Sequence, residues 1–199
     1  MNQSQPHPRA GIPCLFVLIL LAGMTMLTSC NRTESEINNL QQQVWKNPQN
    51  AKAYMLLGNA CAQARRYSEA SAAYKSALAI NPELDDAFHD LGAIAFNQKN
   101  YGEAKKYFQQ HLALAPKDSL RLYDLGNAEM QLGQFDKAAK SYSEAIENSD
   151  SFTDAHYNLA VCYIRTGRKA EAEVIYKWLL VKNNYLAISL QKHLKNEAR

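Results

Sequence analysis

The residue types that most often carry chemistry in proteins are sparse and scattered in this 199-residue chain. The sequence has no glycine-rich loop that could cradle a phosphate, no Gly-x-Ser-x-Gly nucleophile motif and no His-Glu-x-x-His zinc pair. Beyond residue 30 the histidines are isolated, and His111 is expected to be a partly buried structural residue. We therefore expect no catalytic residues, no metal site and no cofactor, and we predict that the protein is not an enzyme.

One cysteine has neighbours that indicate a covalent modification. Residues 14–27 form a largely apolar run, and Leu27-Thr28-Ser29-Cys30 follows at its end. The run is shorter than the roughly 20 residues that span a bilayer and fits the apolar region of a signal peptide. The four residues that end at Cys30 resemble the lipobox of bacterial lipoprotein signal peptides.

This resemblance implies an export route. Residues 1–29 would be removed as a lipoprotein signal peptide, and Cys30 would be lipidated and become the mature N-terminus. Two or more acyl chains anchor a protein stably, because each buried CH₂ contributes about 0.8 kcal/mol. Asn31 follows the cysteine, where some bacteria use Asp to retain lipoproteins in the inner membrane. We therefore expect a lipid-anchored protein of the bacterial cell envelope, with the periplasmic face of the outer membrane favoured. An uncleaved apolar anchor and an ordinary secretory signal are the alternatives.

From residue 51 the sequence repeats with a period of 34 residues. Each unit has a leucine beside a small residue, an alanine twelve positions after the small residue, and an aromatic residue four positions later. The leucine and small residue are Leu57-Gly58, Leu91-Gly92, Leu125-Gly126 and Leu159-Ala160. The alanines are Ala70, Ala104, Ala138 and Ala172, and the aromatic residues are Tyr74, Phe108, Tyr142 and Tyr176. Pro82 and Pro116 close the first two units.

This order of small, aromatic and proline positions resembles the tetratricopeptide repeat (TPR) family over residues 51–184. The resemblance implies an all-α fold, a right-handed superhelical solenoid of TPR helical hairpins. The four units would span about 51–84, 85–118, 119–152 and 153–186. Residues 30–50 would hold the lipidated cysteine, a short linker and an N-terminal capping helix, and residues 185–199 a C-terminal capping helix.

The local pattern predicts the same helices. In the first unit we expect helices over Ala51–Gln63 and Ser68–Ile80, which are too short to be stable alone and must pack against neighbours. Ser68 and Asp136 are expected to be N-caps of second helices. Gly133 and Gly167 are expected in tight turns, where glycine tolerates a left-handed backbone.

In the TPR family the first helix of each hairpin lines a concave groove that holds segments of partner proteins. Residues at i, i+4 and i+7 of these helices share one face, and stacking the units aligns them in columns. The candidate partner-binding groove therefore consists of Met55, Asn59, His89, Phe96, Tyr123, Asn127, Met130, Tyr157 and Ile164, bordered by Asp86, Asp90, Asp124 and Asp154. Alternatively, these residues are packed against neighbouring helices or are solvated charges.

The expected function is a protein-protein interaction scaffold. The net charge of only +3 predicts no nucleic-acid partner. We expect protein or peptide segments with apolar anchors and basic flanks as partners, bound during assembly of an envelope, secretion or pilus-type complex, and contact with the membrane through lipidated Cys30. The alternative is a structural lipoprotein that self-associates as a homo-oligomer and has no peptide ligand.

Overall fold

The computed structural model of the chain describes residues 33–182 and 184–196, and all the regular secondary structure within these ranges is helical. The predicted signal peptide and Cys30 lie outside the described residues. The chain divides into two compact units, and the division falls between Ala73 and Tyr74, within one helix. None of the described helices is long and apolar enough to cross a membrane.

The first unit contains a helix over residues 33–46, then α2 (Ala51–Gln63) and the start of α3 (Tyr67–Ile80). Helix α2 has the bounds expected from the sequence. Ile37 and Leu40 of the first helix are buried. Arg66, just before α3, pairs with Glu34 at 3.1 Å and with Glu69 at 2.5 Å, which ties the first helix to the start of α3.

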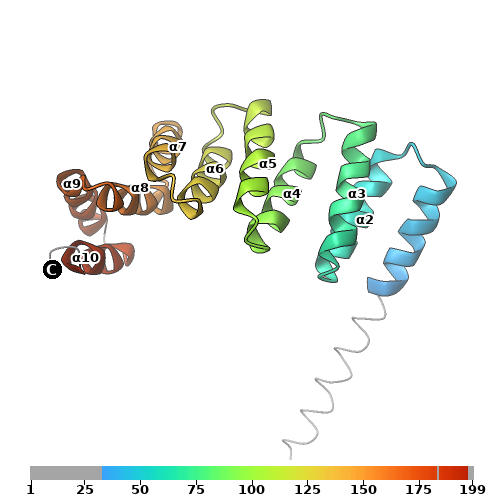
Figure 1. The fold of residues 1–199 in the computed structure, drawn as a ribbon, viewed down its shortest axis with the longest axis horizontal. Helices are drawn as coiled ribbons and strands as arrows, with labels where there is room; N and C mark the ends of the chain where they lie inside the picture. The colour runs from blue at the N-terminus through green and yellow to red at the C-terminus, as the bar shows by residue number, and fades with distance from the viewer. Residues whose placement is uncertain (1–32, 183, 197–199) are drawn as a thin grey trace, which may run out of the picture. The chain divides into compact units, whose positions relative to one another are not determined.

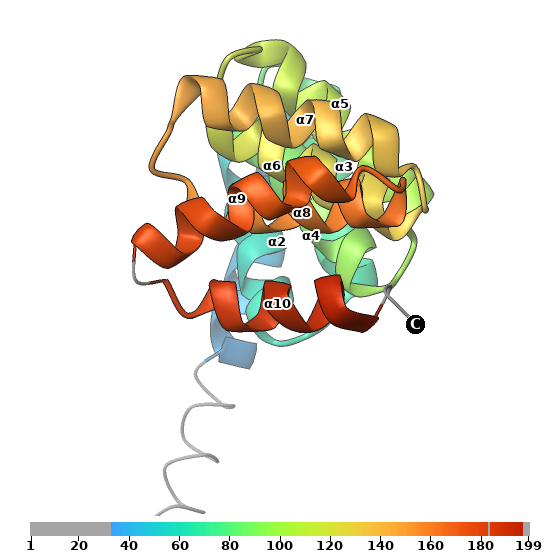
Figure 2. The same cartoon turned by 90° about the vertical axis from the view of Figure 1, so that its left-hand side faces the viewer.

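The second unit continues the pattern of paired helices (Figure 1). From the end of α3 it runs through α4 (Asp85–Asn97), α5 (Tyr101–Leu114), α6 (Ser119–Gln131), α7 (Phe135–Asn148), α8 (Thr153–Arg165), α9 (Lys169–Val181) and α10 (Leu186–Asn196). From α4 onward each helix contacts the next, and α10 packs against both α9 and α8 (Figure 2). Leu190 and Leu194 of α10 are buried in the same core cluster as Leu159 and Leu179.

Glycine and aromatic residues sixteen positions apart meet in space. A Cβ atom on Gly92 would lie 2.5 Å from Cε1 of Phe108, and a Cβ atom on Gly126 would lie 2.7 Å from Cε1 of Tyr142. Both rings are buried against the backbone of the preceding helix. The small residues of the repeat are therefore required by close approach, and the shared core that results holds together helices that would be marginal alone.

The turn inside each hairpin has one geometry, repeated every 34 residues. Arg65, Lys99, Gly133 and Gly167 have positive φ angles of 60°, 61°, 71° and 77°. The next residue closes the turn by donating its N–H to a carbonyl five positions back, as Asn100 does to Ala95 at 2.8 Å. The turns expected at Gly133 and Gly167 are confirmed, and the first two hairpins make the same turn without glycine.

The predicted N-caps Ser68 and Asp136 are wrong. Helix α3 already begins at Tyr67, and α7 begins at Phe135 after Gln134 as its N-cap. The N–H of Gln134 is bonded to Glu129 in the closing turn, so the chain enters α7 directly from that turn. Asp136 lies in the first turn of α7, where its charge favours the helix dipole.

Candidate functional site

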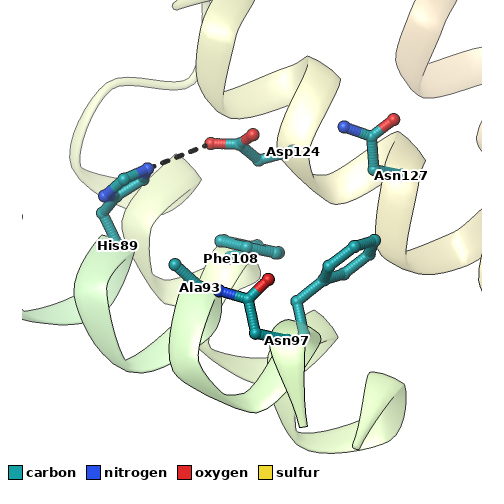
Figure 3. Close-up of a pocket in the computed structure, with 7 residues that line it drawn as sticks. His89, Ala93, Asn97, Phe108, Asp124 and Asn127 are labelled. Atoms are coloured by element: carbon teal, nitrogen blue, oxygen red, sulfur yellow. Dashed lines mark ion pairs between the residues drawn. The ribbon is translucent and has the colours of Figure 1, made fainter. Parts of the chain in front are cut away.

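Three helices of the second unit enclose a pocket of about 190 Å³, which we call the α4–α6 pocket (Figure 3). Helix α4 contributes four of its residues, α5 one and α6 two. The lining residues are His89, Ala93, Phe96, Asn97, Phe108, Asp124 and Asn127. Four of the predicted groove residues are thus brought together here: His89, Phe96, Asp124 and Asn127.

The repeat geometry explains why these side chains converge. His89, Ala93 and Phe96 share one face of α4 through their i, i+4 and i+7 spacing. Phe108 fills the space beside Gly92, so its ring forms the back of the pocket. Phe96 is also held edge-on by Tyr101, with ring centroids 5.2 Å apart. The pocket therefore has a preformed aromatic wall.

The polar side of the pocket is acidic. Nε2 of His89 lies 3.6 Å from Oδ2 of Asp124, and Nδ1 lies 3.6 Å from Oδ1 of Asp90. The Asp124 side chain is only 18% exposed, and its Oδ2 atom is buried without a hydrogen-bond partner among the residues that the structure describes. Burial raises the pKa of Asp124 to about 6, although His89 opposes the shift. The pKa of His89 is raised, mainly by its close contact with the carboxylate of Asp90 and then by the charge of Asp124.

A hydrogen-bond network adjoins the pocket. Asn127 Oδ1 accepts from the Tyr142 hydroxyl at 2.8 Å and from Asn158 Nδ2 at 3.1 Å. Tyr123 accepts from the same Asn158 amide at 3.3 Å and packs against Phe152 with centroids 4.7 Å apart. Tyr123 is therefore half-buried and held by its neighbours, in partial agreement with the alternative that groove residues serve packing.

Two ion-pair clusters were not predicted from the sequence. Arg121 donates from Nη1 to Asp85 at 2.7 Å and to the His111 carbonyl at 2.8 Å. His111 is 8% exposed, so its expected structural role agrees with its position. Lys105 lies 3.1 Å from Glu129, which is buried and also accepts from a serine hydroxyl. No sequence signal marks these pairs, because they join different helices through long side chains.

Three family models match the chain. Two are described as tetratricopeptide repeat and match residues 95–145 and 123–180, and one is described as TPR repeat and matches residues 58–99. The chain belongs to the tetratricopeptide repeat family. The structure therefore has the TPR architecture expected from the sequence, with paired helices, glycine-aromatic contacts and turns that recur every 34 residues.

Solved TPR structures share this fold. The crystal structure of YrrB, described as a TPR protein with an unusual peptide-binding site, is 24% identical with a TM-score of 0.72, and the match covers 84% of this chain and 88% of that chain. The crystal structure of MamA is 19% identical with a TM-score of 0.70 and coverages of 83% and 92%. A MamA structure from Desulfovibrio magneticus RS-1 is 20% identical with a TM-score of 0.68 and coverages of 79% and 90%. No protein of curated function matches the sequence.

The remaining predicted groove residues lie elsewhere on the TPR units. Met130 is half-buried, and its sulfur lies 3.9 Å from the Tyr142 hydroxyl. Tyr157 is half-buried beside His193, with centroids 6.3 Å apart. Asp86 and Asp154 are exposed and Asp90 is half-buried. In the first compact unit, Met55 is half-buried and Asn59 is exposed on α2.

The assignment of Ile164 to an open groove is wrong. Ile164 is 5% exposed and belongs to the same buried core cluster as Leu194 of α10. The C-terminal helix α10 packs on α8 and buries this position.

The pocket lining combines aromatic surface with two titratable side chains, those of His89 and Asp124. Among the residues that the structure describes, no three His, Cys, Asp or Glu side chains are arranged to hold a metal ion. The α4–α6 pocket is therefore a small aromatic cavity with one acidic wall.

Proposed function

We propose that this TPR chain is a non-enzymatic protein-protein interaction scaffold that holds a segment of a partner protein against the α4–α6 pocket. The observation that carries the proposal is the pocket itself, because aromatic walls with a few convergent polar groups are the usual composition of a recognition site. Four of the residues that the sequence assigns to a groove line this pocket. The similar fold of YrrB, described as having a peptide-binding site, supports the same class of function.

Filling the pocket tests this proposal. Ala93 is half-buried on the pocket wall, so Ala93→Trp would occupy the cavity. Ala113 is exposed on α5 outside the pocket, so Ala113→Trp is a matched control. We expect cross-linking in the native cells, followed by mass spectrometry, to recover a protein with the wild-type chain and the control and to lose it with Ala93→Trp. Equal recovery with both variants would contradict the assignment of the pocket.

We further propose that the scaffold acts in the bacterial envelope, tethered through lipidated Cys30 to the periplasmic face of the outer membrane. The support is the sequence Leu27-Thr28-Ser29-Cys30 after an apolar run. The first described helix begins at residue 33, three positions after the cysteine, so the tether would reach only about 10 Å at 3.3–3.6 Å per residue. A scaffold held so close to the membrane suits the assembly of an envelope, secretion or pilus-type complex.

Self-association is a second candidate function, and one observation favours it. Val181, Tyr185 and Ile188, near the junction of α9 and α10, are 85%, 72% and 65% exposed. Large apolar side chains exposed together commonly mark an interface. Light scattering of the chain from Asn31 onward distinguishes the candidates, because a stable dimer at micromolar concentration favours self-association and a monomer favours a separate partner.

A further inference from the structure

We propose that the α4–α6 pocket recognises an arginine of the partner segment, whose guanidinium pairs with Asp124 while its stem lies along the aromatic wall. This inference rests on the proposed function, because it names the chemistry of the residue that the scaffold holds. The ligand of the α4–α6 pocket would thus carry a positive charge at the end of a long apolar stem.

The first argument is the state of the Asp124 carboxylate. Its Oδ2 atom is buried and has no hydrogen-bond partner in the described part of the chain, although almost all buried polar atoms in proteins have one. His89 is 3.6 Å away, beyond the usual range of a hydrogen bond. A buried acceptor without a donor destabilises the fold, so a donor that reaches Oδ2 would recover part of the lost free energy on binding.

The second argument is the charge around the pocket. His89 interacts with three carboxylates, those of Asp86, Asp90 and Asp124. It is the only basic residue among the described residues that line the pocket, and a single imidazole cannot neutralise three acids. A carboxylate ligand would be repelled here, and a cationic ligand attracted.

The third argument selects arginine over lysine. Phe96 and Phe108 contribute aromatic surface to the lining, and a guanidinium stacks on aromatic rings and donates to both oxygens of a carboxylate. An ammonium group is a compact charge that holds its water more strongly. An arginine side chain can satisfy the aromatic and the acidic walls together.

The fourth argument is that the next repeat lacks the same site. The residue one period after Asp124 is Asn158, whose amide already donates to Asn127, Tyr123 and Tyr142. One period before Asp124 stands Asp90, which faces His89. Among the TPR units that the structure describes, the buried carboxylate with an unsatisfied oxygen therefore belongs to the pair formed by the second and third repeats.

A displayed library of random dodecapeptides, selected on the immobilised full-length chain, tests the inference. We expect selected peptides to be enriched in arginine beside apolar residues. Selection on Asp124→Asn, which keeps the shape of the side chain, should lose the arginine enrichment. Asp154→Asn removes one exposed carboxylate from α8, outside the pocket, and should keep it.

Replacing arginine by citrulline in a selected peptide removes the charge at nearly constant shape. We expect affinity for the wild-type chain to fall about ten-fold or more, and affinity for Asp124→Asn to change by less than about two-fold. Circular dichroism melting establishes that each variant is folded. Two outcomes would overturn the inference and leave the scaffold proposal standing. The selected peptides could lack arginine, or the citrulline replacement could lower affinity for Asp124→Asn as much as it lowers affinity for the wild-type chain. A library from which no peptide is enriched would overturn both.

Discussion

At the scale of single residues, Asp124 has the most unusual environment in the α4–α6 pocket. Its pKa is raised to about 6 because burial disfavours the charged form, with Asp118 adding to the shift and His89 opposing it. His89 in turn faces Asp86 and Asp90 on its own helix, and its ring lies 5.4 Å from that of His111 on α5. The folded state therefore binds a proton at Asp124 more tightly than the unfolded chain does.

The tighter binding of a proton in the folded state predicts how Asp124→Asn changes stability with pH. A raised folded-state pKa means that ionisation of Asp124 destabilises the fold as pH rises through about 6, whereas below the unfolded pKa near 4 both states are protonated. We expect Asp124→Asn to raise the free energy of unfolding by about 1–3 kcal/mol at pH 7.5 and by close to nothing at pH 4. Urea denaturation across this range measures the difference. The exposed control Asp154→Asn should show no such trend, and a gain that does not vary with pH would contradict the assignment.

The residues of this pocket were only partly predictable from the sequence. Helical spacing places His89 and Phe96 on one face of α4, because that spacing depends on backbone geometry alone. The partners of His89 and the orphaned oxygen of Asp124 depend on side-chain conformations and on the depth of burial, which periodicity does not determine. The pairing of Arg121 with Asp85 was missed for the same reason, since it joins two units through one long side chain.

At the scale of helices, the contact between a glycine and an aromatic ring sets the distance between the two helices of the second and third hairpins. Tyr142 is fully buried and bonded to Asn127, so its ring cannot move aside for a methyl group on Gly126. We expect Gly126→Ala to lower the free energy of unfolding by about 1–3 kcal/mol, as overpacking does. Gly102 on α5 has nothing within 4 Å of an added Cβ, so Gly102→Ala should raise it by up to about 1 kcal/mol. Thermal or urea unfolding should show that the two variants change the free energy of unfolding in opposite directions. A change in the same direction would show that the Tyr142 ring moves to accommodate the added methyl group.

The turns give a second test at this scale. Lys99 adopts φ of 61°, a left-handed conformation that costs a non-glycine residue about 1–2 kcal/mol, and two equivalent turns use glycine. We expect Lys99→Gly to raise the free energy of unfolding by about 1 kcal/mol, with part of the gain offset by the greater freedom of glycine in the unfolded chain. The reverse change Gly133→Ala should lower it by a similar amount. Urea denaturation measures the free energy of unfolding of both variants. If neither value differs from that of the wild-type chain, the turn is not strained.

The residue ranges of the helices were more predictable than the residues that cap them. Helix α2 has the bounds that the sequence predicts, because its apolar pattern and the flanking turns act locally. The N-caps were only partly predictable from residue type, since the side chains of Asn100 and Asp118 cap α5 and α6 but Gln134 before α7 makes no side-chain bond. Ile164 was assigned to a groove because its position in the repeat suggests one, but α10 packs on that face.

At the scale of the whole molecule, the fold could be predicted because each TPR unit contacts mainly its neighbours, so a fixed period in the sequence becomes a fixed stacking in space. The membrane attachment depends on a different signal. It rests on four residues that end at Cys30, outside the described part of the chain.

Attachment can be tested separately from binding. We expect the full chain, expressed in a bacterium with two membranes, to incorporate radiolabelled palmitate and to fractionate with membranes, because two or more acyl chains give stable anchoring. Cys30→Ser should abolish the label and leave an unprocessed precursor, whereas Cys162→Ser, at a buried thiol inside α8, should keep the label. Asn31→Asp should also keep the label and move the protein from the outer to the inner membrane in a sucrose gradient. Label that persists in Cys30→Ser would contradict the proposed anchor and leave the scaffold proposal to be judged by the pocket variants alone.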